Sequence, residues 1–309
     1  MRSFSEEIEL DVDKETDLIG ITQYYINSKS GNRGSLNQEI VDQLSSQEAE
    51  TEVMNLLTRL PISTYWTTNY DKVIENGLKK NNRRGDIKKK IQDLSVSISD
   101  SDAIVYKMHG DVESPNDAVI SKDDYERYSD KNSLFVTALR GDLVSKTFLF
   151  VGFSFEDPNL ESILGKVNIL LGDNKREHYC IQKQVSENEY EKKEEYDYAK
   201  IKQDLKIKDL QRYGIETVLV NEYPEIPKLI SKIEEEYLKN TIFISGSISD
   251  YNDNWSEEKV DQFCYELSRS LVSKNYKILS GFGLGIGSSV INGALDEIYK
   301  TKYRHVSEH

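Results

Sequence analysis

The sequence predicts an α/β protein with a mostly parallel sheet, followed by a second, smaller α/β domain. Segments with helical spacing of apolar residues alternate with short apolar runs of strand length, which is typical of strand–helix–strand units. In addition, three polar turns each directly follow a strand-like run, where an open parallel sheet places its ligand-binding crevice. The turns are Trp66-Thr67-Thr68-Asn69-Tyr70-Asp71, Lys107-Met108-His109-Gly110-Asp111 and Gly152-Phe153-Ser154-Phe155-Glu156-Asp157-Pro158-Asn159.

Most of the predicted elements lie in the first part of the chain. Apolar residues at helical spacing predict helices over residues 14–27, 36–60 and 159–171. Short apolar runs predict strands over residues 62–65, 103–107, 147–153, 178–182 and 215–220.

Two highly charged segments favour exposed structure. Residues 186–208 mix both signs of charge, which suits a solvated helix with ion pairs one turn apart. The basic run over residues 79–90 resembles a nucleic-acid patch, but the chain is acidic and the run lacks an aromatic stacking platform. We therefore interpret residues 79–90 as an exposed insertion.

Composition narrows the class of protein. The chain has 309 residues, enough for two domains, and 40 basic against 54 acidic residues give a net charge of −14. This charge argues against a nucleic-acid partner. The sequence shows neither an apolar run long enough to span a membrane nor the apolar core of a signal peptide, so we expect a cytoplasmic protein. Cys180 and Cys264 lie among apolar or aromatic neighbours, and we expect buried free thiols.

The three turns resemble those of sirtuin-like NAD-consuming domains, in which an Asn-x-Asp, a His-Gly and a Gly-x-Ser turn enclose NAD. The resemblance implies a Rossmann-type parallel sheet, NAD⁺ as substrate, and a pocket-lining helix that opens over residues 122–128. It also implies catalytic roles for Asn69 and His109. The implied NAD-binding residues are Thr68, Asp71, Gly110, Gly152, Ser154, Asp157 and Asn159.

These residue types suit the chemistry on physical grounds as well. Breaking the nicotinamide–ribose bond builds positive charge on the ribose while a neutral amide departs, so the site needs a positioned water and a group that holds the leaving amide. We expect Asn69 to position the water and Asp71 to hold the amide. His109 can accept a proton from a ribose hydroxyl or water at neutral pH. Gly152 admits close backbone approach, and Ser154 supplies a hydroxyl.

Structural roles are the alternative for the same residues. In that interpretation Asn69 caps a helix that starts near Tyr70, His109 is a hydrogen-bonded turn residue, and Gly152 only turns the chain. Any one turn alone would favour this interpretation, whereas the three together favour a nucleotide site.

The cysteine count bears on the acceptor. Sirtuin deacylases carry a four-cysteine zinc module that helps to form the acyl-peptide cleft, and two widely spaced cysteines cannot form such a module. We therefore expect no metal, and water rather than an acetyl-lysine peptide as the acceptor.

The second domain is expected after residue 238. Residues 241–247 and 276–280 read as strands, and residues 260–272 and 290–300 as helices. The glycine-rich loop from Gly281 to Ser289 links the second strand to its helix, where backbone N–H groups can bind a phosphate. A tight turn that packs the helix on the sheet is the alternative.

This second part resembles the opening of a SLOG domain, a Rossmann-like fold that binds nucleotide derivatives. The implied signal-binding residues are Ser245, Gly246, Ser247, Gly281, Phe282, Gly283 and Gly285. A sirtuin-like NADase joined to a SLOG domain is the arrangement of the effectors of Thoeris antiphage systems. That resemblance implies a homo-oligomer that destroys NAD⁺ when its SLOG domain binds a cyclic ADP-ribose signal made by a TIR-domain partner.

The sequence also departs from that family pattern. Residues 1–13 contain no glycine, whereas the family has a strand and a glycine phosphate loop before its first helix. The SLOG part stops after its second strand and helix, and residues 301–309 read as a frayed polar tail. We therefore expect a sirtuin-like domain over residues 1–238 that lacks its glycine loop, and the N-terminal part of a SLOG domain over residues 239–309.

Two functions from different classes are therefore predicted. The first is an NAD⁺ glycohydrolase gated by a cyclic nucleotide. The second is a catalytically impaired nucleotide-binding or assembly subunit, such as a fragment or decayed copy, in which this chain would be inactive. A deacylase is a distant third.

Overall fold

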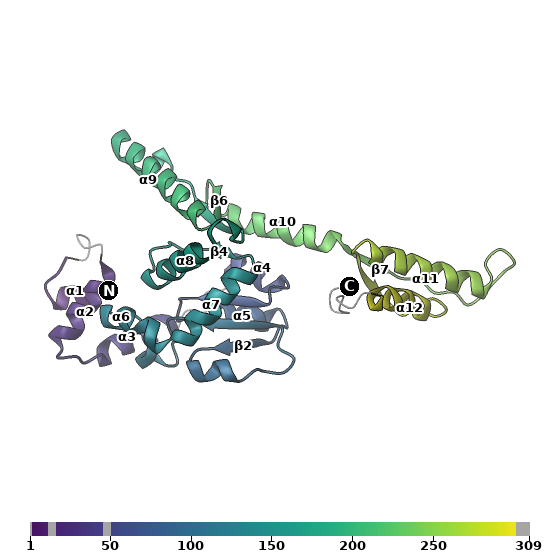
Figure 1. Cartoon of the computed structure of the whole chain (residues 1–309), viewed down its shortest axis with the longest axis horizontal. Coiled ribbons are helices and arrows are strands. Elements are labelled where there is room, and N and C mark those ends of the chain that lie inside the picture. Colours follow the sequence, from purple (N-terminus) through teal and green to yellow (C-terminus); the bar gives the residue numbers. More distant parts are fainter. Residues whose placement is uncertain (1, 12–16, 46–50, 301–309) are drawn as a thin grey trace. The chain divides into compact units, whose positions relative to one another are not determined.

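A computed structural model describes residues 2–11, 17–45 and 51–300 of the chain. By their internal contacts the residues form two compact units, Met1–Lys228 and Leu229–His309 (Figure 1). Among the described residues, none of the helices is both long and apolar enough to cross a membrane.

The first unit contains two three-stranded sheets, and every described strand pair in them is parallel, as predicted. One sheet has the order β1-β3-β2 and the other β4-β5-β6. The strands are β1 (Thr64–Thr67), β2 (Gly85–Lys88), β3 (Ala103–Lys107), β4 (Leu149–Val151), β5 (His178–Lys183) and β6 (Ile215–Val220). The helices are α1 (Arg2–Glu7), α2 (Leu18–Ser28), α3 (Gly34–Ser45), α4 (Glu52–Arg59), α5 (Val73–Lys80), α6 (Lys122–Lys131), α7 (Ser133–Ser145), α8 (Pro158–Leu171) and α9 (Lys193–Arg212). Short 3₁₀ turns are η1 (Ile91–Ser95), η2 (Pro115–Asp117), η3 (Gly172–Asn174) and η4 (Glu187–Glu189).

The main core of this unit joins β5 and β6 to helices α6, α7 and α8. Its fully buried members include Leu139, Leu143, Ile163 and Ile215. Burial of one such side chain contributes about 1.5–3 kcal/mol relative to leaving it exposed. Because α8 packs into this core, its first residues are held in place, and they adjoin the polar turn after β4.

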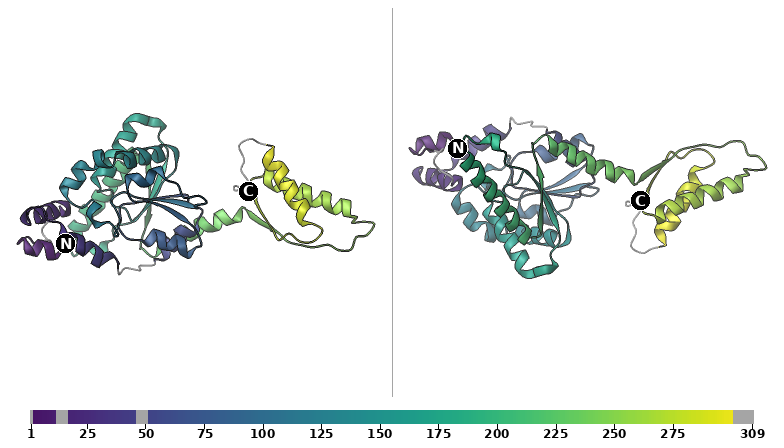
Figure 2. Two further views of the ribbon diagram at one scale, coloured as in Figure 1. Left: turned by 90° about the horizontal axis from the view of Figure 1, so that it is seen from below. Right: turned by 90° about the horizontal axis from the view of Figure 1, so that it is seen from above.

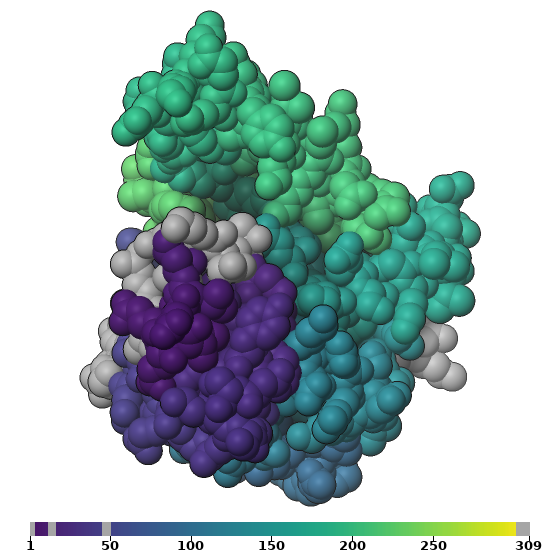
Figure 3. Space-filling model, turned by 90° about the vertical axis from the view of Figure 1, so that its left-hand side faces the viewer, coloured from purple at the N-terminus to yellow at the C-terminus, as the bar shows by residue number. Residues whose placement is uncertain are grey.

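The N-terminal helices pack beside α6 and the turn before it. Arg33 donates to the Asp124 carboxylate at 2.8 Å and to the Ala118 carbonyl at 2.9 Å. The Gln23 side chain accepts a hydrogen bond from the Asp123 N–H at 2.9 Å. Figure 3 shows these helices, in purple, gathered on one face of the first unit.

Two predictions about elements were wrong. The helix expected over residues 36–60 is two helices, because Thr51 has extended backbone and its hydroxyl caps a new helix by accepting from the Met54 N–H. Residues 46–50, and residues 14–16 of the first predicted helix, lie outside the described residues.

Residues 79–90 are not an exposed insertion, because they contain β2, which pairs with β3. Asp86 and Lys88 are buried and form an ion pair at 2.8 Å. The Arg83 guanidinium donates to the carbonyls of Thr58 and Ile62, which fixes the chain before β2. Each buried charge therefore has a partner, as burial of a charge requires.

The second unit places α11 and α12 side by side against one face of a two-stranded parallel sheet (Figure 2). Its elements are β7 (Thr241–Ile244), α11 (Glu257–Ser273), β8 (Lys277–Ser280) and α12 (Gly287–Tyr299), and α10 (Glu225–Lys239) spans the boundary between the units. Val260, Cys264 and Val290 form its core. Cys180 and Cys264 are both buried free thiols, which confirms that prediction. The predicted tail over residues 301–309 lies outside the described residues.

Candidate active site

The first polar turn follows β1 and leads into α5. Asn69 is exposed, and its N–H donates to the Thr67 hydroxyl at 3.0 Å. Asp71 accepts a hydrogen bond from the Val73 N–H at 3.0 Å, which closes a tight turn just before α5. The N-cap position of α5 is Lys72, which makes no side-chain cap, so the cap that the structural interpretation assigned to Asn69 is not observed and Asn69 is exposed at the strand end.

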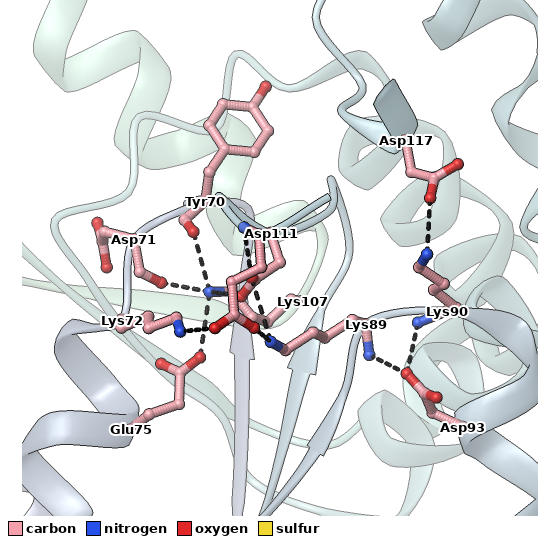
Figure 4. Close-up of polar contacts among 11 residues, drawn as sticks. Tyr70, Asp71, Lys72, Glu75, Lys89, Lys90, Asp93, Lys107, Asp111 and Asp117 are labelled. Atoms are coloured by element: carbon pink, nitrogen blue, oxygen red, sulfur yellow. Dashed lines mark hydrogen bonds and ion pairs between the residues drawn. The ribbon is translucent and has the colours of Figure 1, made fainter. Parts of the chain in front are cut away.

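Lys107, the last residue of β3, binds the backbone of this turn. Its fully buried ammonium donates to the carbonyl oxygens of Tyr70 (3.1 Å) and Asp71, and to the carboxylates of Glu75 (3.1 Å) and Asp111 (2.6 Å) (Figure 4). Lys107 occupies a buried position in a strand whose inward residues alternate. The backbone of the Asn69 turn is thereby tied to the end of the central strand of the sheet.

The same ionic cluster extends to Lys89, the residue after β2. Asp111 also accepts from Lys89 at 3.1 Å, and Glu113 accepts from Lys89 at 2.6 Å and from Lys72. Burial opposes ionisation of Asp111, but the hydrogen bond from Lys107 and those from the Glu113 N–H and Lys89 hold its pKa below the usual value. Hydrogen bonds from Lys72 and Lys89 lower the pKa of Glu113 to about 2. Both carboxylates are therefore ionised at neutral pH.

His109 lies in the turn after β3 and is only 3% exposed. Its Nε2 atom is 3.3 Å from Oδ2 of Asp157, and the rings of Tyr125 and Tyr128 meet the imidazole edge-on at 5.3 and 5.7 Å between centroids. Burial lowers the pKa of His109, and the Asp157 carboxylate partly opposes this effect. The imidazole is therefore neutral at pH 7 and able to accept a proton.

The backbone of this turn is fixed by close packing. The His109 carbonyl accepts from the Val119 N–H at 2.9 Å. Gly110 has a φ of +100°, and a Cβ there would lie 3.2 Å from backbone atoms of Asp117 and Ala118. Glycine is required for this conformation and this close approach.

The third polar turn leads from β4 into α8. Gly152 has a φ of +66° with open space where a Cβ would lie, and Ser154 is exposed, with its hydroxyl accepting from the Glu156 N–H at 3.3 Å. Asp157 caps α8 by accepting from the N–H groups of Asn159 (3.0 Å) and Leu160 (2.9 Å).

Three buried polar atoms of this neighbourhood have no hydrogen-bond partner among the described residues. They are the hydroxyl of Tyr128, Nδ2 of Asn159 and Nε2 of His109, which faces Oδ2 of Asp157 at 3.3 Å without a hydrogen bond of good geometry. Buried polar atoms in proteins are normally hydrogen-bonded, so such atoms call for an explanation such as a ligand or an ordered water. Their presence around His109 fits a polar ligand.

The structure thus brings together some of the predicted site residues and not others. His109 and Asp157 are in contact; Gly110 directly follows His109 in sequence, and Asn159 lies two residues after Asp157. Among the described contacts, none joins the side chains of Asn69, Thr68 or Ser154 to His109. Sequence reasoning missed Lys107 and Asp111, although a lysine at an inward strand position with an aspartate four residues later was a readable signal. In the described ranges, His, Cys, Asp and Glu side chains form no group of three or more that could hold a metal ion.

In the second unit the glycine turn packs against the segment after β7. The Ile248 N–H donates to the Leu284 carbonyl at 2.9 Å. A Cβ on Gly283 would lie 1.6 Å from the Gly246 carbonyl oxygen, and one on Gly285 would lie 2.5 Å from that of Ile248. The chain's own backbone therefore fills the space beside these glycines, as the tight-turn alternative expects. Ser245, Ser247, Gly281 and Phe282 remain exposed, and Phe282 has a φ of +51°.

Comparison with known families agrees with this architecture. Residues 63–208 match the SIR2-like domain family, and residues 225–309 match the Sir2- and TIR-associating SLOG family. Both are Rossmann-like folds, as the sequence predicted.

Curated relatives match along nearly the whole chain. The NAD(+) hydrolase ThsA of Bacillus cereus (strain MSX-D12) is 48% identical over 97% of this chain and 63% of its own length. The NAD(+) hydrolase ThsA of Cytobacillus dafuensis is 44% identical over 100% of this chain and 64% of its own length. The protein of the same name from Acinetobacter baumannii (strain 532279) is 41% identical over 100% of this chain and 64% of its own length.

The chain spans somewhat less than two thirds of the length of these relatives. The two family matches follow one another in the same chain, in the order predicted from the motifs. The domain order and the similarity to these relatives together support a ThsA-type protein, in which a match to the SIR2-like domain family precedes a match to the Sir2- and TIR-associating SLOG family.

Proposed function

We propose that the first unit hydrolyses NAD⁺, with water as the acceptor. The observation that carries the proposal is the buried His109, which faces Asp157 at the carboxyl end of a parallel sheet while Lys107 anchors the neighbouring Asn69 turn. The names of the curated relatives as NAD(+) hydrolases support the same reaction.

The proposed reaction breaks the bond between the nicotinamide nitrogen and C1′ of the ribose. The bonding electron pair leaves with nicotinamide, which becomes neutral, and positive charge develops on the ribose. The oxygen of a water then bonds to C1′, and its proton passes to His109, which is neutral at pH 7 because of its burial. The products are nicotinamide and ADP-ribose, and the proton taken up by His109 is released to solvent.

Each site residue has a role in this proposal. Asn69 positions the attacking water, and Asp71 contributes to holding the leaving amide. Gly152 and Ser154 admit the ribose and phosphates to the backbone, together with Thr68 and Asn159, while Gly110 packs the His109 turn against Asp117 and Ala118. The open space beside Gly152 and the unpaired amide of Asn159 support these placements.

An isotope experiment tests both the reaction and its acceptor. Because the relatives are longer than this chain, the complete gene product is assayed in ¹⁸O-labelled water with NAD⁺. We expect ADP-ribose that carries one ¹⁸O atom, formed at least about 10²-fold more slowly by Asn69→Ala. Asn76→Ala, an exposed asparagine on α5, is the matched control and should retain the wild-type rate. Unlabelled product would contradict water as the acceptor, and an Asn69→Ala variant as fast as Asn76→Ala would contradict the role of Asn69.

A second candidate function is a catalytically impaired nucleotide-binding or assembly subunit. Calorimetry with NAD⁺ distinguishes the two candidates. Binding without any release of nicotinamide would support the impaired subunit and contradict the hydrolase.

We also propose that the second unit senses a cyclic ADP-ribose signal made by a TIR-domain partner, and that the protein acts in the cytoplasm as a homo-oligomer in antiphage defence. The match to a Sir2- and TIR-associating SLOG family supports the sensor. The candidate contacts are Ser245, Gly246, Ser247, Gly281, Phe282, Gly283 and Gly285.

Substitution of an exposed side chain tests this sensor better than substitution of a glycine, because a Cβ on Gly283 or Gly285 would already clash with the chain's own backbone. Ser247 is exposed, and Ser247→Ala should weaken the binding of cyclic ADP-ribose and the activation of NAD⁺ turnover. Ser270→Ala, on the exposed side of α11, is the control and should change neither. Equal binding and activation in both variants would contradict the assignment of Ser247.

A further inference from the structure

Asp157 uses its two carboxylate oxygens for two different contacts. Oδ1 accepts from the N–H groups of Asn159 and Leu160 and so caps α8. Oδ2 lies 3.3 Å from Nε2 of His109 and accepts from the Tyr125 hydroxyl at 3.4 Å. The side chain of Asp157 is 11% exposed and that of His109 is 3% exposed, so little solvent separates the two.

The cap fixes the direction of the second oxygen. Pro158 occupies the first turn of α8, and Leu160, Ile163 and Leu164 bury that helix in the core. With Oδ1 held by two backbone donors, Oδ2 can move little relative to the imidazole. A rigid element that carries a carboxylate against a histidine is the arrangement by which many enzymes orient a catalytic base.

We propose that Asp157 is the positioning residue of His109, rather than a direct contact to NAD⁺. The negative charge of its carboxylate, 3.3 Å from Nε2, favours the tautomer with the hydrogen on Nε2, which leaves Nδ1 as the nitrogen that accepts the proton. Asp157 also stabilises the imidazolium that forms once the proton has been taken up. This inference rests on the proposed hydrolysis of NAD⁺.

The groups around His109 determine how its pKa, and so the pH dependence of activity, should respond to the loss of Asp157. Asp157 faces the ring from α8, and the phenols of Tyr125 and Tyr128 face it from α6. Tyr70, from the turn after β1, donates to the Val119 carbonyl close by. Burial raises the pKa of all three phenols, which therefore stay neutral where histidine titrates. Asp157 is then the charged group that raises the pKa of His109, and its removal should lower that pKa.

Asp157→Asn separates the two contacts of Asp157, because asparagine caps a helix about as well as aspartate but carries no charge. Asp17→Asn is the matched control, since Asp17 caps α2 by accepting from the Gly20 N–H at 2.8 Å. The complete gene products are compared by thermal melting and by kcat/KM for NAD⁺ between pH 5 and 9.

We expect both variants to melt close to the wild type. Asp157→Asn should lose about 10²-fold in kcat/KM, and the acidic limb of its pH profile should move to lower pH. Asp17→Asn should change neither. A wild-type rate and profile in Asp157→Asn would overturn the inference.

Two further measurements test the positioning role of Asp157 independently of whether a variant folds and of whether the proposed reaction is correct. NMR titration of the His109 ring should give a lower midpoint in Asp157→Asn, or in Asp157→Ser if the former does not fold, and an unchanged midpoint would overturn the inference even without turnover. If His109→Ala keeps full turnover, the proposed site itself fails. If His109→Ala is inactive while Asp157→Asn behaves as wild type, only the positioning role fails.

Discussion

Lys107 and Asp111 form an ion pair of 2.6 Å in which both side chains are completely buried. The pair joins the end of β3 to the turn that carries Asn69, because the same ammonium group also binds the carbonyls of Tyr70 and Asp71. A buried ion pair is weak evidence for added stability, but removal of one partner leaves the other charge buried and unpaired. The pair therefore fixes a geometry, and its loss should be costly.

Lys107→Met tests this anchor. We expect a loss of about 3–5 kcal/mol in the free energy of unfolding of the first unit, because Asp111 and Glu75 lose a buried partner. Lys79→Met, an exposed lysine on α5, is the matched control and should change the free energy by less than about 0.5 kcal/mol. Urea unfolding measures the stability of both variants. Equal stability would contradict a stabilising role of the Lys107 ion pairs.

Stability should also depend on pH through the buried histidines. Burial lowers the pKa of His109, and burial together with the nearby Arg176 lowers that of His178. Below the unfolded value of about 6.5, the unfolded chain binds more protons than the folded chain, so the free energy of unfolding falls as the pH falls. Each histidine contributes at most about 1.4 kcal/mol per pH unit.

The measurement is urea unfolding between pH 7 and pH 5.5, a window in which Asp111 and Glu113 stay ionised because their pKa values are lowered. We expect His109→Gln to reduce the slope of stability against pH. The same slope in the wild type and in His109→Gln would mean that His109 titrates alike in the folded and unfolded states.

The glycine turn of the second unit gives a matched pair of substitutions. A Cβ on Gly283 would lie 1.6 Å from the Gly246 carbonyl, whereas one on Gly281 would make ordinary contacts of 3.7 Å or more. Gly283→Ala should therefore destabilise this unit by about 1–3 kcal/mol or more, and Gly281→Ala should cost far less. Hydrogen exchange of residues 241–248 reports the difference. Equal protection in both variants would show that the two segments do not pack as described.

Sequence patterns predicted the elements best where hydropathy alone decides the structure. The strands over residues 103–107 and 215–220 have the predicted bounds, because each is a short apolar run that pairs along its length with neighbouring strands. β2 was missed because its buried Asp86 and Lys88 neutralise each other at 2.8 Å, which hydropathy cannot show. The break between α3 and α4 was missed because apolar spacing continues through a segment where Thr51 starts a new helix.

The candidate site was predictable as separate residues but not as an arrangement. His109 and Asp157 each stood in a motif, yet they lie on different turns, and only the packing of α8 brings them to 3.3 Å. The spacing of Lys107 and Asp111 was a readable signal of an ion pair, but the burial of Lys107 depends on four acceptors from three separate segments, which the sequence does not show. The order of the motifs predicted the fold and the region of the site. The contact partners of His109 and Lys107 could be identified only from the tertiary structure.

The release of nicotinamide from NAD⁺ by the complete gene product, compared between the wild type and His109→Ala, tests the central claim most directly. Burial of a neutral imidazole at the strand ends predicts steady release by the wild type and a loss of at least about 10²-fold in His109→Ala. Thermal melts of both proteins must show that the variant is folded at the assay temperature. Release by a folded His109→Ala at the wild-type rate would contradict the claim that this histidine takes part in the hydrolysis of NAD⁺.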